Sequence, residues 1–119
     1  MRKIITLVCL TVALAAQQFA QAHAMLDHAS PAVGSTVATP PQEVVLWFTE
    51  QLEPAFSTIE VRGPGGMLVS TGRAQVGGDK TQMHVGLKQL APGNYKVNWR
   101  ALSVDTHRTQ GSFSFHVAP

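Results

Sequence analysis

The strongest constraint on the fold is an alternation of apolar and polar residues that recurs along the second half of the sequence. In residues 94–101 and again in residues 111–117, every second position is apolar or small and the positions between are polar. Residues 81–87 repeat the pattern, with Met83, Val85 and Leu87 on the apolar face. Because successive side chains of a strand point to opposite faces, this spacing predicts β-strands with one buried and one solvated face.

The rest of the chain beyond residue 23 also favours strands over helices. Residues 43–49 contain an uninterrupted apolar run at positions 44–48, which predicts a strand covered on both faces. Residues 58–61 and 67–70 flank the sequence Gly-Pro-Gly-Gly at 63–66, which predicts a hairpin turn. A further strand near the start of the mature chain is predicted from Leu26 and residues 33–37. Many short strands separated by turn residues are typical of an antiparallel β-sandwich.

The first 22 residues have the organisation of a secretory signal peptide. Arg2 and Lys3 precede an apolar stretch over residues 4–16, and Ala20-Gln21-Ala22 forms a small-residue cleavage site. The apolar stretch is shorter than the roughly 18 residues expected of a membrane span. The sequence therefore predicts cleavage after Ala22, secretion through the Sec pathway to the periplasm, and a single mature domain over residues 23–119.

Processing changes the chemistry available to the mature chain. Cys9 is the single cysteine and lies in the signal peptide, so no disulfide or thiolate ligand remains. Arg2 and Lys3 are also removed, which brings the nine basic residues of the chain into balance with its seven acidic ones. A near-neutral domain gives no support to nucleic-acid binding, and no basic amphipathic helix is present for contact with a membrane.

Cleavage would make His23 the first residue, and a terminal histidine offers two nitrogen donors. Its α-amine and imidazole Nδ1 can chelate one ion in a ring. Nitrogen and carboxylate donors in a tetragonal plane suit Cu(II). The alternative is that the first mature residue has no role and frays, as chain ends often do.

Asp105-Thr106-His107 lies between the two clearest predicted strands and supplies further donors. In an extended segment residues i and i+2 point to the same side, so Asp105 and His107 can present an oxygen and a nitrogen to one point. With His23 they make three nitrogens and one oxygen, enough for a tetragonal Cu(II) site. The alternative for Asp105 is a side chain that stabilises a turn by bonding its own backbone.

These residues carry a resemblance to the periplasmic copper-binding CopC family. The similar segments are the start of the mature chain, His23-Ala24-Met25-Leu26 with Ser30-Pro31-Ala32, then Trp47-Phe48-Thr49-Glu50, the pattern W-R-x-x-S-x-D-x-H over residues 99–107, and Gly111-Ser112-Phe113-Ser114-Phe115. Together they cover essentially the whole mature chain.

The resemblance implies an immunoglobulin-like or cupredoxin-like Greek-key β-sandwich. It implies one Cu(II) per chain held by His23, Asp105 and His107, with Glu50 as a weak ligand or outer-shell partner; Glu50 is equally well explained as a solvated strand end. It also implies an inner-membrane CopD-like copper protein as a partner. The methionine-rich, Cu(I)-binding loop of some members is missing here, where the matching region holds Met67 alone.

Three functions remain open on the sequence. The leading hypothesis is a non-enzymatic copper carrier, buffer or chaperone acting in copper homeostasis and resistance. A copper-dependent oxidative enzyme of the histidine-brace type would use a similar terminal histidine, but such enzymes are usually longer and need a flat face of exposed aromatic side chains. A metal-free adhesion or assembly module would use the sandwich as a scaffold, since one fold serves many functions.

Overall fold

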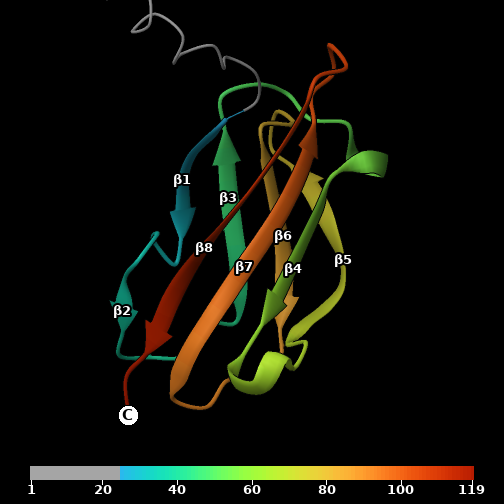
Figure 1. Ribbon diagram of the computed structural model, residues 1–119. Coiled ribbons are helices and arrows are strands. Elements are labelled where there is room, and N and C mark those ends of the chain that lie inside the picture. The colour runs from blue at the N-terminus through green and yellow to red at the C-terminus, as the bar shows by residue number, and fades with distance from the viewer. Residues whose placement is uncertain (1–24) are drawn as a thin grey trace, which may run out of the picture.

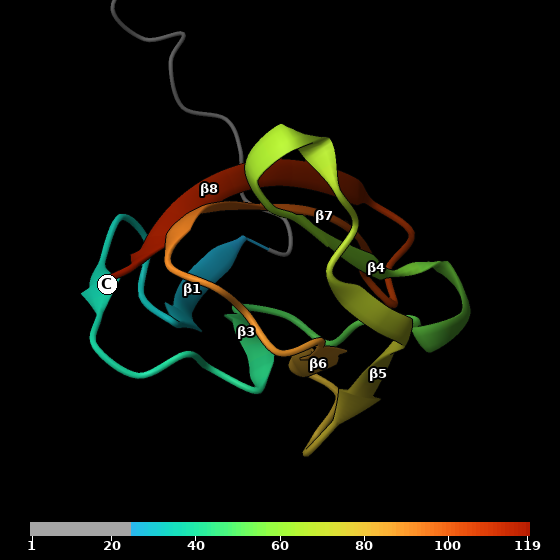
Figure 2. The ribbon, with the colours of Figure 1, turned by 90° about the horizontal axis from the view of Figure 1, so that it is seen from below.

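The structure, a computed structural model, describes residues 25–119 and contains two four-stranded sheets packed face to face (Figures 1 and 2). The predicted signal peptide and His23 lie outside the described residues. In the order of their hydrogen-bonded neighbours, the first sheet contains β1 (Leu26–Ser30), β3 (Glu43–Phe48), β6 (Gln82–Leu87) and β5 (Ser70–Gly77). The second contains β2 (Thr36–Val37), β8 (Arg108–Val117), β7 (Gly93–Leu102) and β4 (Thr58–Arg62).

The topology confirms the all-β sandwich expected from the sequence. Neighbouring strands are antiparallel except β2 and β8, which pair in parallel. Apart from the β5–β6 and β7–β8 hairpins, the connections cross from one sheet to the other. The short helical turns η2 (Pro54–Phe56) and η3 (Pro64–Gly66) lie in two of these crossings. Within residues 25–119, no helix has the length and apolar character needed to cross a membrane.

The alternating apolar side chains fill the space between the sheets, as predicted. On β7 and β8 the inward positions are buried and those between are more exposed. The indole of Trp99 meets the ring of Phe48 edge to face across the core, with their centres 5.1 Å apart. On β3, Val44, Val45 and Leu46 are all buried, which confirms the strand covered on both faces.

Two local predictions are only partly correct. The turn at residues 63–66 forms, and Val69 donates its backbone N–H to the carbonyl of Val61 at 2.8 Å. The chain then leaves β4 and enters the other sheet as β5. This strand gives no apolar alternation because it lies at the sheet edge, where half of its residues are exposed and only Ser70 is buried. Near the start, the strand predicted over residues 33–37 shortens to Thr36–Val37, and β1 precedes it.

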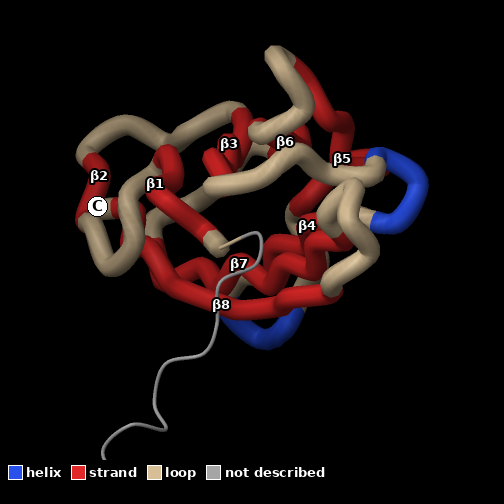
Figure 3. The backbone as a smooth tube through the Cα atoms, turned by 90° about the horizontal axis from the view of Figure 1, so that it is seen from above, coloured by secondary structure: helices blue, strands red, loops and turns tan. Residues whose placement is uncertain are grey.

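One end of the sandwich, which we call the loop end, brings three chain segments together. β1 begins there, because Leu26 pairs with Phe48 at the end of β3. The β7–β8 connection lies at the same end, because Leu52, just after β3, forms a bridge with Ser103. Figure 3 views the molecule from this side, with the start of β1 close to β7 and β8.

Candidate functional site

The connection between β7 and β8 at the loop end is a tight turn over residues 103–107. Ser103 donates its backbone N–H to the carbonyl of His107 at 3.0 Å, and Thr106 donates its own to the carbonyl of Ser103 at 2.8 Å. Thr106 has a φ of 73°, in the left-handed region that non-glycine residues seldom occupy. The backbone therefore reverses direction within a few residues.

This turn brings the side chains of Asp105 and His107 together. His107 Nδ1 lies 3.2 Å from Asp105 Oδ1, and each side chain is 51% exposed. The sequence predicted this juxtaposition from an extended segment, and that reason is wrong. The pair meets because the backbone turns at Thr106, so the two donors face each other across a bend rather than along one face of a strand.

Ser103, which the sequence analysis did not single out, positions this pair. Its side chain is fully buried, and its Oγ donates a hydrogen bond to Asp105 Oδ1 while accepting one from the backbone N–H of His107 at 3.2 Å. The hydrogen bond from Ser103, followed by the one from His107, holds the pKa of Asp105 below its usual range. The signal was present in the sequence as the serine of W-R-x-x-S-x-D-x-H.

A second set of hydrogen bonds places the start of the described chain beside this turn. Val104 donates its backbone N–H to the carbonyl of Gln51 at 3.0 Å. Two residues earlier, Thr49 is paired with Met25 in both directions: the Met25 N–H reaches Thr49 Oγ1 at 3.0 Å, and the Thr49 N–H reaches the Met25 carbonyl at 3.0 Å. The segment at residues 49–51 thus joins the turn to Met25.

Glu50 lies in the middle of this joining segment and is half-buried. The structure does not gather it with Asp105 and His107 into one cluster: within residues 25–119, no three His, Cys, Asp or Glu side chains are close enough together to hold a metal ion. The described part of the chain therefore supplies two of the predicted donors, and the other predicted donors belong to His23.

His28 and His116 have neighbours of their own away from this turn. His28 stacks on Trp47 with ring centres 4.3 Å apart, and its Nδ1 is 2.7 Å from Asp27 Oδ2. His116 Nδ1 is 2.7 Å from Asn94 Oδ1, at the end of β8 opposite the turn. His116 lies on the polar face of β8 and is half-buried.

The three methionines that follow the predicted signal peptide are not close together. Met83 is fully buried, which confirms that it belongs to the core. Met25 and Met67 are 42% and 62% exposed. Met25 precedes β1 at the loop end, whereas Met67 follows η3 at the far end of β4. They form no common thioether site.

The geometry of the Asp105–His107 pair fits the binding of one metal ion. Two donors bound at right angles through bonds of about 2.0–2.2 Å lie roughly 3 Å apart, close to the 3.2 Å between Nδ1 and Oδ1. An ion bound to both atoms requires little change in the distance between them. The lowered pKa of Asp105 keeps the carboxylate ionised and ready to bind a cation.

Comparison with known proteins agrees with this fold. The chain is 39% identical over 98 residues to protein YobA of Escherichia coli strain K12, covering 81% of this chain and 79% of that protein. It is 36% identical over 123 residues to copper resistance protein C of Xanthomonas campestris pv. juglandis, covering 98% and 96%. The crystal structure of CopC from Methylosinus trichosporium OB3b superposes with a TM-score of 0.75 at 37% identity, covering 82% and 95%. The CopC domain model matches residues 26–118, nearly all of the sandwich, and the chain therefore belongs to the CopC family.

Proposed function

We propose that this protein is a periplasmic Cu(II) carrier or buffer that acts in copper homeostasis and resistance without being an enzyme. Residues 1–22 are removed as a signal peptide, and one Cu(II) binds to the amine and imidazole of His23, the carboxylate of Asp105 and the imidazole of His107. Glu50 acts as a weak ligand or accepts a hydrogen bond from the terminal amine, orienting it.

The observation that carries this proposal is the pairing of Asp105 and His107 beside the segment that holds Met25. His23 precedes Met25 by two residues, and two residues of chain span at most about 7 Å. A terminus tied down so close to its anchor needs little extra ordering to act as a ligand. Membership of a family that includes copper resistance proteins supports copper as the metal.

The partner that we propose for copper exchange is an inner-membrane CopD-like copper protein. The absence of a thiolate from residues 23–119 favours a role with the oxidised ion. The proposal is tested by titrating the processed protein with Cu(II) against a chelator of known affinity. We expect one equivalent of tightly bound Cu(II). No binding, or several weak equivalents, would refute the function.

We expect Ser103→Ala to weaken Cu(II) binding although Ser103 does not touch the metal. Loss of its hydroxyl removes the largest cause of the lowered pKa of Asp105, so this pKa should rise toward its ordinary value in the metal-free protein. Removal of such an orienting partner typically costs about 10–100-fold in metal affinity. An NMR pH titration and a copper competition titration measure the two effects.

Ser70→Ala is the matched control for this variant. Ser70 is also a buried serine whose hydroxyl accepts a backbone N–H, that of Val61, but it lies at the far end of β4. If Ser70→Ala and Ser103→Ala reduce copper affinity equally, the effect is one of general stability and Ser103 does not position the site.

We expect Cu(II) binding to weaken as the pH falls from about 8 to about 5. The terminal amine and the imidazoles must lose their protons to bind the metal, and free imidazole titrates near ~6.5. Asp105, with its lowered pKa, stays ionised through this range, so its protonation contributes only at still lower pH. Competition titrations across the range measure the effect, and constant affinity would contradict a site built on histidine.

We expect reduction to release the metal. Cu(I) prefers soft sulfur ligands, and Met83 is buried while Met25 and Met67 lie at opposite ends of the sandwich. Ascorbate with a Cu(I)-specific chromophoric chelator should strip the protein under anaerobic conditions. Stoichiometric retention of Cu(I) that Met67→Leu abolishes would show instead that the protein carries both oxidation states.

A further inference from the structure

The surface beside the turn at residues 103–107 combines exposed apolar side chains with arginines. Phe56, at the end of η2, is 64% exposed, and Val104 within the turn is 43% exposed. Phe56 lies on the wall of a hollow of about 540 Å³ that also includes Arg100, Leu102 and Arg108. We call these four lining residues, Phe56, Arg100, Leu102 and Arg108, the arginine face.

The two arginines lie close together on the outer side of the second sheet. Arg100 pairs with Gln110 across β7 and β8, and Leu102 pairs with Arg108, so Arg108 is the diagonal neighbour of Arg100. Diagonal neighbours are about 7–8 Å apart, within reach of long side chains. Two cations are therefore held near each other on a surface where both are exposed.

Neither charge is balanced from within the described chain. Arg62, further down the same side of the sheet, binds Glu60 with its guanidinium 3.0 Å from the carboxylate. Among residues 25–119, by contrast, no ion pair and no side-chain hydrogen bond is formed by Arg100 or by Arg108. Adjacent like charges without a partner repel each other, and an anion placed between them removes that repulsion.

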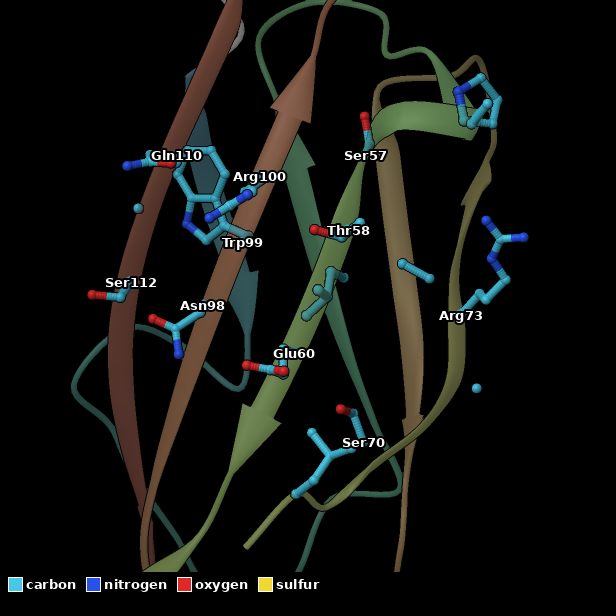
Figure 4. Close-up of a pocket in the computed structure, with 17 residues that line it drawn as sticks. Ser57, Thr58, Glu60, Ser70, Arg73, Asn98, Trp99, Arg100, Gln110 and Ser112 are labelled. Carbon is cyan, nitrogen blue, oxygen red and sulfur yellow. The ribbon is translucent and has the colours of Figure 1, made fainter. Parts of the chain in front are cut away.

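The hollow continues into a larger one of about 850 Å³, which Figure 4 shows between β4, β7 and β8 on one side and β5 on the other. Arg100 lies where the two meet, in a row across the sheet with Thr58 and Gln110, and Arg73 stands on the opposite side (Figure 4). An extended peptide segment bound along both hollows would therefore contact hydrogen-bonding side chains as well as the arginines.

From these contacts we infer that the arginine face is the docking surface for an acidic segment of a partner protein that exchanges copper with this chain. Arginine recognises carboxylates through paired hydrogen bonds, and aromatic residues and arginine are the types enriched at the centres of protein interfaces. Phe56 and Leu102 supply apolar contact for a side chain next to the acidic one. The copper exchange rests on the proposed function, whereas the docking itself does not.

The position of the face suits such an exchange. Arg108 directly follows His107, so a segment docked there lies beside the ion-binding pair. Cu(II) held by the single carboxylate of Asp105 adds positive charge next to the arginines. An acidic partner is therefore attracted to the same end of the molecule by the arginines and by the bound metal.

The test uses the processed, copper-free protein and a synthetic probe, the capped pentapeptide Asp-Phe-Glu-Leu-Asp, observed by NMR. We expect shifts confined to the arginine face and its continuation, and weaker binding as salt is added. The neutral peptide Asn-Phe-Gln-Leu-Asn should bind at least about 10-fold more weakly, because it lacks the charged acceptors. Equal binding of the two peptides, or shifts spread over the whole surface, would overturn the inference.

Charge reversal supplies the second arm. The double substitution Arg100→Glu with Arg108→Glu should weaken binding of the acidic peptide by at least about 10-fold. Lys96→Glu is the matched control, because Lys96 is an exposed cation on the same face of β7 toward the other end of the strand. This variant should bind the acidic peptide as tightly as the wild-type protein does. If the double variant misfolds, Arg100→Gln with Arg108→Gln answers the same question. Equal loss in the control would contradict a specific surface.

Two further arms separate the remaining explanations. Glutarate at the same concentration as the peptide should cause little shift, because it lacks the apolar part; equal shifts would show a small-anion site instead of a docking surface. Copper titration of the same samples keeps the two proposals apart. If the wild-type protein binds no Cu(II), the proposed function fails, while the peptide result still decides whether the arginine face docks an acidic segment.

Discussion

A protein extended by one residue before His23 is expected to bind Cu(II) at least about 100-fold more weakly than the processed form, a difference of about 2.8 kcal/mol. The extra residue converts the α-amine into an amide, which no longer offers a lone pair to the metal in a ring with Nδ1. Asp105, His107 and the hydrogen bonds between Met25 and Thr49 remain in the extended form. The comparison therefore isolates the contribution of the free terminus.

The measurement is a competition titration of the processed and extended proteins side by side. A protein that begins at His23 but carries His23→Ala serves as a second comparison, because it keeps the amine and loses the imidazole. Both altered forms should keep the fold, since the two sheets are built from residues beyond Met25. Equal affinity in all three forms would remove His23 from the site.

His107→Ala and Asp105→Ala are each expected to reduce Cu(II) affinity by about 100-fold or more. Each removes one donor of a pair whose atoms lie 3.2 Å apart. Tenfold in affinity corresponds to about 1.4 kcal/mol, so such a loss amounts to about 2.8 kcal/mol. Asp105→Asn separates charge from shape, because it keeps the size of the side chain while losing the anion, and it should bind nearly as weakly as Asp105→Ala.

His116→Ala is the matched control, because it removes an imidazole from the same strand at the end away from the turn. It should leave the affinity unchanged. The same competition titration measures all four variants. Wild-type affinity in His107→Ala and Asp105→Ala would exclude the turn as the binding site, and a loss in His116→Ala equal to that in His107→Ala would point to a general effect of histidine removal.

The strands with the clearest alternation of apolar and polar residues could be predicted from the sequence, because that alternation follows directly from which side chains are buried. β7 contains residues 94–101, β8 contains residues 111–117, and β6 covers the predicted strand at 81–87 except its first residue. The apolar side chains of all three lie toward the core, as predicted. β5 could not be predicted in this way, because an edge strand has few buried positions to create a pattern. The parallel pairing of β2 with β8 depends on contacts between distant segments, which periodicity does not encode.

At the candidate site, the residue types could be predicted but their arrangement could not. The pattern D-x-H indicated that Asp105 and His107 act together, but the bend that unites them depends on the positive φ of Thr106 and on the buried hydroxyl of Ser103. The tie between Met25 and Thr49 joins residues far apart in the sequence. Neither residue carries a local signal of that contact. Glu50 follows β3 and lies in the segment that joins the turn to Met25. It does not form a three-residue metal-binding cluster with Asp105 and His107.

The central claim is that one Cu(II) is bound jointly by the processed terminus and the turn at residues 103–107, and electron paramagnetic resonance tests it most directly. With one equivalent of Cu(II), the processed protein should give the axial spectrum of a tetragonal site with splitting from three nitrogens. His107→Ala and the form extended before His23 should each give a spectrum with fewer nitrogen couplings. An identical spectrum from the processed and extended proteins, or a processed protein whose copper signal shows no nitrogen coupling, would contradict the account.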